Sequence, residues 1–124
     1  MIDFQNASFI KMHETDKSEY NSLIDPLLIE DEEIVRTFKA MRDGVVFTNK
    51  RILSINVQGL TGKKKDFTSL PYNKIQSFSV ETAGLLDLDS ELDLWFSGLG
   101  KVKFEFTRDV NVPKISQFIA SKLL

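Results

Sequence analysis

The sequence predicts an α+β fold that is mainly β, in which seven short antiparallel strands form a barrel or sandwich capped by a C-terminal helix. Two patterns predict it. Short runs of alternating apolar and polar residues recur between residues 33 and 108, and residues 111–124 carry an apolar stripe at helical spacing. The length of 124 residues, with 42% hydrophobic and 27% charged residues, is typical of one folded domain. We therefore expect a single domain over 1–124, with an extra N-terminal helix in an extension over 1–30.

Residues 1–13 carry little pattern, and the N-terminal helix is expected to begin after them. Asp16 and Glu19 have the spacing of a capping box at its start. The apolar residues that recur at helical spacing are Tyr20, Leu23, Ile24, Leu27 and Leu28. Pro26 interrupts this pattern. The helix therefore either stops near Asp25, or a second short turn begins there with the proline at its first position.

The strands follow from alternation and from the turns between them. We expect them at residues 33–42, 44–48, 51–58, 63–70, 75–83, 91–96 and 101–107. The second turn contains Asn49, which tolerates the left-handed backbone conformation. In the third strand, Leu53, Ile55 and Val57 are expected to face inward and Ser54 and Asn56 outward. Ile75 is out of phase with its strand, which indicates a bulge or a late start.

The last two strands and the C-terminal helix have the clearest patterns. The inward positions of these strands are Leu92, Leu94, Phe96, Val102, Phe104 and Phe106. In the helix, Asn111 or Val112 is the expected cap and Pro113 lies in the first turn. Its apolar stripe consists of Ile115, Phe118, Ile119 and Leu123. The phenylalanines expected in the core are Phe47, Phe78, Phe96, Phe104, Phe106 and Phe118. Phe4 and Phe9 fall outside this pattern, so we expect the N-terminal segment to dock on the barrel or on a neighbouring molecule.

Four stretches of the chain carry a family resemblance. They read LIDPLLIEDEEI, MRDGVVFTNKRILSI, QGLTGKKKDFTSLPYNKIQSFSVETAG and DLDSELDLWFSG. With these stretches in this order, the chain resembles the bacterial pleckstrin-homology-like family. The family occurs in short bacterial proteins and was long described as a domain of unknown function. The resemblance runs from about Leu23 to Leu123. It implies a two-sheet, seven-stranded barrel capped by a C-terminal helix, and members that assemble into ring-like homo-oligomers. No established ligand or reaction comes with it.

Lys63, Lys64 and Lys65 follow the turn QGLTG and are the first candidate site. Eukaryotic pleckstrin-homology domains that bind phosphoinositides place basic residues in the first inter-strand loop. Here that loop contains Arg42 beside Asp43 and is short and nearly neutral. On a strand, the first and third lysines face one side and the second faces the other, so the run does not converge on one headgroup. Binding of an anionic ligand or a membrane surface through these lysines is the alternative function.

Four acidic residues at every second position are the second candidate site. They are Asp87, Asp89, Glu91 and Asp93. A calcium loop starting at the first of them would need Gly at its sixth position and Glu at its twelfth, where this chain has Leu92 and Gly98. We therefore expect no metal there, and read the last two acidic residues as the outward side of a strand.

The two candidate sites make more sense together. Residues 50–66 hold five basic residues and one acidic residue, whereas residues 81–93 hold five acidic and no basic ones. Separate patches of opposite sign suit a head-to-tail contact between copies, which closes into a ring when the rotation allows. Trp95, predicted outward, would be its aromatic anchor. The alternative is that both patches are ordinary solvated surfaces and that the tryptophan covers a local loop.

Other functions lack the residues that they require. The chain has no cysteine, a single histidine at His13, and none of the nucleophile, phosphate-loop or dinucleotide motifs. The net charge of −2 disfavours nucleic-acid binding. We therefore expect no enzymatic activity and no cofactor. The expected partners are other copies of the chain and an unidentified protein or peptide, with membrane binding as the alternative. In the absence of a recognisable signal sequence or spanning segment, we expect a cytoplasmic protein.

Overall fold

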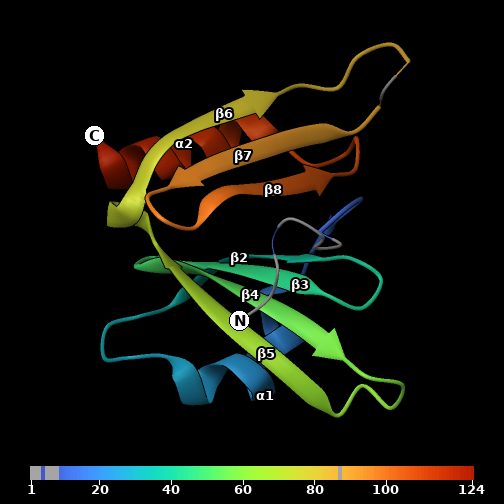
Figure 1. Ribbon diagram of the computed structural model, residues 1–124, viewed down its shortest axis with the longest axis vertical. Helices are drawn as coiled ribbons and strands as arrows, with labels where there is room; N and C mark the ends of the chain where they lie inside the picture. The colour runs from blue at the N-terminus through green and yellow to red at the C-terminus, as the bar shows by residue number, and fades with distance from the viewer. Residues whose placement is uncertain (1–3, 5–8, 87) are drawn as a thin grey trace.

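The computed structural model describes Phe4, residues 9–86 and residues 88–124, and it shows two antiparallel sheets (Figure 1). The five-stranded sheet has the order β1-β2-β3-β4-β5 and the three-stranded sheet the order β6-β7-β8. The strands are β1 (His13–Thr15), β2 (Ile34–Lys39), β3 (Gly44–Thr48), β4 (Arg51–Gln58), β5 (Lys64–Pro71), β6 (Ile75–Glu81), β7 (Ser90–Phe96) and β8 (Gly100–Phe106). The seven expected strands are all present, and the described part of the chain adds β1, in a segment with no strand pattern.

The two sheets form a sandwich, not a closed barrel. On one side, the chain turns the corner between them through the short 3-10 helix η3 (Tyr72–Lys74). On the other side, the N-terminal segment contacts both sheets: Phe9 and Met12 exchange backbone hydrogen bonds with Glu105 of β8, and β1 then pairs with β2. Lys11, between these contacts, has a φ of 52° and changes the direction of the chain. The N-terminal segment is therefore part of the sandwich.

The main core lies between the sheets and contains the predicted inward side of β7 and β8. Leu92, Leu94, Val102, Phe104 and Phe106 are all completely buried. Of the other phenylalanines assigned to the core, Phe47 and Phe96 are buried, and Phe78 and Phe118 are partly buried against it. Phe9 is also buried, edge-on to Phe104 with ring centroids 5.5 Å apart, and Phe4 stacks on Phe9. The N-terminal segment thus docks on its own sandwich.

A second, smaller core lies on the opposite side of the five-stranded sheet, where the N-terminal helical segment covers it (Figure 1). This segment is not one regular helix: it consists of the 3-10 helix η1 (Lys17–Tyr20), α1 (Asn21–Ile24) and the 3-10 helix η2 (Asp25–Leu27), which carries Pro26. Asp16 caps it, as predicted, by accepting a hydrogen bond from the Ser18 backbone N–H. The side chain of Glu19 does not complete a capping box; it pairs with Lys39.

Strand β4 departs from the predicted assignment because both of its sides are buried. Leu53 and Ile55 pack under the helical segment, and Ile52 packs in the core between the sheets. Ser54, expected in solvent, is completely buried on the Ile52 side. Asn49 lies in the expected turn between β3 and β4 but does not take the left-handed conformation that it tolerates. Its side chain instead joins the turn to the preceding loop, accepting from the Glu33 N–H and donating to the Asp31 carbonyl.

Helix α2 (Val112–Leu123) packs behind the three-stranded sheet (Figure 1). Asn111 caps it by accepting a hydrogen bond from the Lys114 N–H, and Pro113 lies in its first turn. Ile115 and Ile119 are buried in the core between the sheets. The register of β6 and β7 shifts between Ile75 and Ser77, which confirms the predicted irregularity.

Candidate functional site

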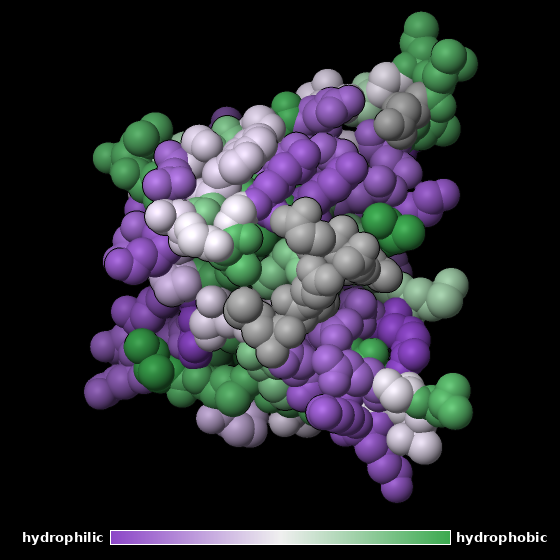
Figure 2. Space-filling model, viewed as in Figure 1, coloured by the Kyte–Doolittle hydropathy of each residue, from purple (hydrophilic) through white to green (hydrophobic). Residues whose placement is uncertain are grey.

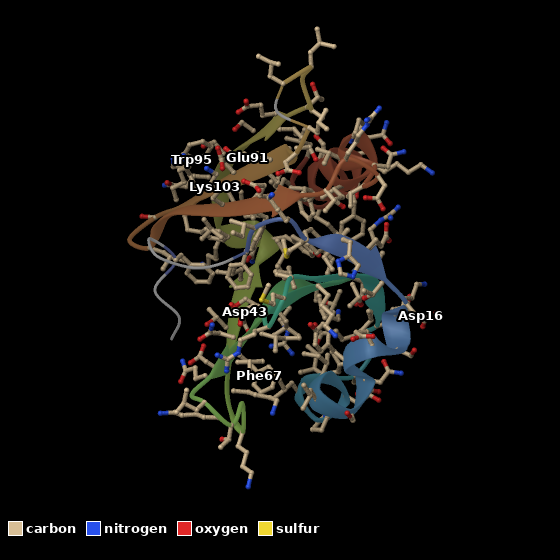
Figure 3. All side chains as sticks on the ribbon, turned by 90° about the vertical axis from the view of Figure 1, so that its right-hand side faces the viewer. Asp16, Asp43, Phe67, Glu91, Trp95 and Lys103 are labelled. Carbon is tan, nitrogen blue, oxygen red and sulfur yellow. The ribbon has the colours of Figure 1, made fainter. Side chains whose placement is uncertain are left out.

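The predicted contact residues lie in two separate places. Lys63, Lys64 and Lys65 lie at the β4–β5 turn, at the lower end of the molecule in Figure 1. Glu91, Asp93 and Trp95 lie on β7, in the upper half. Figure 3 shows the labelled Glu91 and Trp95 on the side of the three-stranded sheet opposite α2. Asp87 lies outside the described residues, and Asp89 precedes β7. One copy of the chain does not bring the lysines and the acidic residues together.

The lysines follow a turn that is exposed at its tip. Leu60, between Gly59 and Gly62, is fully exposed at 106%. Strand β5 begins at Lys64, so Lys63 precedes the strand and the expected alternation applies only to the last two lysines. Lys64 is exposed, as is Lys63, whereas the Lys65 ammonium donates to the Gly62 carbonyl at 3.0 Å. Two exposed lysines and an apolar tip therefore project together from this turn.

The outer side of the three-stranded sheet is a polar grid, because β7 lies between β6 and β8. Its cross-strand rows are Ser77–Trp95–Lys101, Ser79–Asp93–Lys103 and Glu81–Glu91–Glu105. The last row places three glutamates directly opposite one another, an arrangement that is unfavourable without cations nearby. The grid as a whole holds four acidic and two basic residues, so it stays negative. We call it the acidic grid.

The net charge of this surface is less negative than the sequence suggests, because β8 contributes two lysines. Lys103 forms an ion pair with Glu91 at 3.0 Å, and the Lys101 ammonium lies 3.7 Å from the Asp93 carboxylate. Lys101 also lies over the Trp95 ring, 5.8 Å from its centroid. A count along residues 81–93 finds no basic residue, but the sheet supplies two from a later strand. Lys101 and Lys103 are thus members of the candidate site that the sequence analysis missed.

Asp93 lies at the centre of the grid and is 9% exposed. Its Oδ1 atom is buried and accepts no hydrogen bond from the described residues. Burial raises the pKa of Asp93 to about 6, and the neighbouring Glu91 carboxylate adds to the rise. For Glu91, burial acts in the same direction, but the hydrogen bond and charge of Lys103 outweigh it and lower its pKa. Asp93 is therefore the carboxyl of this pair that holds a proton in weakly acidic solution.

We expect Asp93→Asn to stabilise the protein at pH 8 by about 1–2 kcal/mol and to change its stability little at pH 4. The raised pKa means that the native state binds a proton between about pH 4 and pH 6 that the unfolded chain has lost. The contribution of Asp93 to the free energy of unfolding therefore falls as the pH rises through that range. Asparagine does not titrate, so it removes this contribution. Urea unfolding at both pH values measures the difference, with Asp25→Asn as an exposed control. If the free energies of unfolding of Asp93→Asn and wild type differed by the same amount at both pH values, the raised pKa of Asp93 would be contradicted.

Two of the hollows that the described residues form are each larger than 500 Å³. One, of about 530 Å³, lies between β6 and the end of α2 and is lined by Asn73, Ile75, Gln76, Ser77, Phe78, Lys122, Leu123 and Leu124. Because β6 is an edge strand, its backbone beside this hollow can pair with an added strand. The other, of about 550 Å³, lies at the β2–β3 turn and is lined by Ile10, Lys11, Ala40, Met41, Arg42, Asp43, Asn56 and Val57. Figure 3 shows the labelled Asp43 in the lower half of the molecule.

Exposed apolar side chains at the turns are a feature that the sequence analysis missed. Met41, Leu60, Leu85 and Leu86 are each at least 95% exposed and lie in the β2–β3, β4–β5 and β6–β7 turns. These three turns project on one side of the molecule (Figures 1 and 2). Apolar residues inside turn sequences such as QGLTG and AGLL were the available signal, because turns are otherwise polar.

The possible metal ligands of the described residues are dispersed. No three of their His, Asp or Glu side chains group in a way that could hold a metal ion. His13 is exposed on β1, opposite Lys39. Within the same part of the chain, none of the helices has the length and apolar character needed to cross a bilayer.

Comparison with known proteins relates this architecture to one family. The family model described as bacterial PH domain matches residues 3–123. The uncharacterised protein YjqA of Bacillus subtilis is 46% identical over 97 residues, which cover 77% of this chain and 78% of that protein. Two crystal structures are similar. One is of a DUF1696 family protein with a pleckstrin-homology domain from Shewanella loihica, with a TM-score of 0.81 and 37% identity over 93% of this chain and 99% of that one. The other is of a pleckstrin-homology domain from Shewanella amazonensis, with a TM-score of 0.68 and 41% identity over 96% of this chain and 93% of that one.

Proposed function

Because this chain is a member of the bacterial pleckstrin-homology domain family, we propose that it is a non-catalytic domain that assembles with copies of itself into a ring-like homo-oligomer and mediates protein–protein interaction. One observation carries the proposal: the lysine-bearing β4–β5 turn lies at the lower end of the molecule, whereas the strands that carry the acidic grid lie in its upper half (Figure 1). A contact between two different surfaces is heterologous, and repeated copies of it form a ring when the rotation closes.

The chemistry of the two surfaces supports this head-to-tail contact. Lys63 and Lys64 are exposed and carry the positive charge. The acidic grid retains a negative excess even with its own lysines counted. Trp95 is half-buried there with the Lys101 ammonium over its ring, and aromatic side chains are enriched among the residues that contribute most to binding. Opposite charges would set the orientation of the contact and the tryptophan would supply its apolar centre.

Light scattering tests the assembly. We expect the wild type to form an oligomer at micromolar concentration, and Trp95→Ala or Glu91→Lys to shift it toward monomers by at least about tenfold in the association constant. Lys64→Glu should act in the same way, because it removes the opposite partner. Lys114→Glu, which makes the same charge change in α2, is the control and should leave the mass unchanged. A wild type that stays monomeric at this concentration would refute self-assembly.

The hollow between β6 and the end of α2 is the proposed site for a protein partner. β6 is an edge strand of its sheet, and Phe78 and Leu123 are among the apolar residues in the mixed lining of the hollow next to it. Pleckstrin-like domains commonly take extended peptides in this way, by adding a strand to a sheet edge. A partner here would lie against β6 and the end of α2, in a hollow that shares only Ser77 with the acidic grid.

Binding of an anionic membrane through Lys63–Lys65 is the second candidate. It is favoured by Leu60, whose fully exposed side chain is close in sequence to two exposed lysines and would insert between headgroups while they contact the phosphates. Pelleting with anionic vesicles at low and high salt separates the two functions. Salt-sensitive pelleting that Leu60→Asp abolishes supports the membrane; a stable oligomer that does not pellet supports self-assembly.

A further inference from the structure

We propose that the β6–β7 turn of one copy inserts Leu85 and Leu86 into the hollow at the β2–β3 turn of a second copy. Both features lie on the side where the three turns project (Figure 1). The two copies would therefore exchange their turns reciprocally, in a two-fold contact. The inserted leucines and the lining of the hollow share no residue with the head-to-tail contact proposed above. The contact adds a second interface to the self-association on which it rests.

The leucine pair is exposed without a covering element among the described residues of its own chain. Leu85 is 98% and Leu86 100% exposed, and Leu88 beyond them is 46% exposed. The turn projects from the end of the three-stranded sheet (Figure 1), and Figure 2 shows an apolar projection at that position. Adjacent large apolar side chains at the tip of a projecting turn are typical of an anchor that enters a pocket on a partner.

The receiving hollow has a matching apolar lining. It is about 550 Å³ in volume, and Ile10, Met41 and Val57 are the large apolar side chains that line it. Met41 is 95% and Ile10 54% exposed, so two of these side chains are also uncovered in the isolated chain. The hollow therefore has the character of a site that an apolar side chain would fill, and the leucine pair is of a size to enter it.

Charge also distinguishes the turn from the hollow. Lys11 and Arg42 are exposed at the hollow, and the one carboxylate in its lining, Asp43, is buried and already accepts hydrogen bonds from Asn56 and the Val57 N–H. The β6–β7 turn instead lies between acidic residues, with Glu81 before it and Asp89 after it. An acidic turn and a cationic hollow attract each other.

The same charges argue against a bilayer as the occupant of the leucine pair. A membrane that inserts all three turns at once must be anionic to attract Lys11 and Arg42. That membrane would repel Glu81 and Asp89 beside the leucines. A second copy of the chain meets both requirements, because it presents the acidic turn to the cationic hollow and the cationic hollow to the acidic turn.

Cross-linking tests the contact cleanly, because the full chain contains no cysteine. Leu86→Cys and Met41→Cys are placed on separate chains that carry different tags, and the two are mixed and treated with a short bismaleimide. We expect the mixed product, which joins position 86 of one chain to position 41 of the other, to exceed either homodimeric product by about tenfold. Ile29→Cys, at a residue 61% exposed on the N-terminal segment, is the matched control and should cross-link with neither.

The outcomes separate this contact from the head-to-tail one. The cross-link should survive Trp95→Ala, and Leu86→Asp should lower the association constant of the two-fold pair by about tenfold or more. An oligomer that forms without the mixed product overturns this inference alone. If the mixed product forms but Trp95→Ala leaves the oligomer mass unchanged, the head-to-tail contact alone is overturned. If Leu86→Asp abolishes pelleting with phosphatidylglycerol vesicles and leaves the mass unchanged, the occupant is a bilayer and this inference is wrong.

Discussion

Gly44→Ala is expected to lower the free energy of unfolding by about 2–4 kcal/mol, because the added methyl group has no space beneath Tyr20. A Cβ atom at position 44 would lie 2.5 Å from Cε2 and 2.6 Å from Cζ of the Tyr20 ring, and closer still to the hydroxyl oxygen. The glycine is buried at the start of β3, where the strand pairs with β2 and β4. The strand cannot withdraw without breaking these pairs, so the ring must move.

The tyrosine has little freedom to move, because it closes the smaller core. It is 7% exposed and packs with Ile24, Val46, Leu53 and Ile55. Displacing its ring would lift the N-terminal helical segment from the sheet and expose this cluster. The cost therefore includes lost apolar burial as well as steric overlap.

A double-mutant cycle isolates the contact. Gly44→Ala is measured by urea unfolding in the wild type and in a Tyr20→Ala background, where the methyl group has space. We expect its cost in that background to fall by more than half. An equal cost in both backgrounds would show that the effect arises from β3 itself and not from the tyrosine.

The sequence predicts this fold well wherever one side of a strand is buried and the other is not. In β8, Val102, Phe104 and Phe106 alternate with charged residues, and the structure buries all three. Strand β4 lacks this contrast, because the helical segment buries Leu53 and Ile55 while the opposite sheet buries Ile52. Alternation alone then identifies the strand but not which core each side enters. The three residues of β1 are too few for any pattern, and only their pairing with β2 makes them a strand.

The candidate site shows a similar limit. Glu91 and Asp93 were found from their spacing, but the lysines that neutralise part of their charge come from the next strand along the chain. The pairing of β7 with β8 brings Lys103 to 3.0 Å from Glu91 and Lys101 to 3.7 Å from Asp93. A local charge count cannot include such partners, because strand register is set by long-range packing. The apolar turn residues were visible in the sequence, yet only the structure shows that the three turns project on one side of the molecule.

Arg51→Met is expected to lower the free energy of unfolding by about 3–5 kcal/mol at about pH 7, because it leaves the buried Glu32 carboxylate without its cation. The Glu32 side chain is fully buried and that of Arg51 is 21% exposed. The arginine donates to both carboxylate oxygens at 2.9 Å, and also to the Leu27 carbonyl and the Ser69 hydroxyl. It thus joins three parts of the chain: the helical segment, strand β5, and the loop that precedes β2.

The pH dependence of this effect has a definite sign. Burial would raise the pKa of Glu32, but hydrogen bonds from Arg51, Thr48 and the Ile29 N–H outweigh it and lower the pKa. Wild type therefore gains stability from this carboxylate above its ordinary pKa of about 4.5 and loses it as the pH falls. In Arg51→Met the carboxyl can take up a proton instead. Because burial then raises the pKa of the unpaired carboxyl, the difference in the free energy of unfolding between the variant and wild type should shrink as the pH falls from neutral toward and below about 4.5.

A second arginine–glutamate pair in the same chain provides the control. Arg36 and Glu14 form an ion pair at 2.9 Å, but their side chains are 26% and 40% exposed. Arg36→Met should therefore cost less than about 1 kcal/mol. The double variant Glu32→Leu, Arg51→Met should be more stable than Arg51→Met alone, because no buried charge remains unpaired. Equal losses for Arg36→Met and Arg51→Met in urea unfolding at about pH 7 would show that burial of the carboxylate is not what makes the Glu32–Arg51 pair strong.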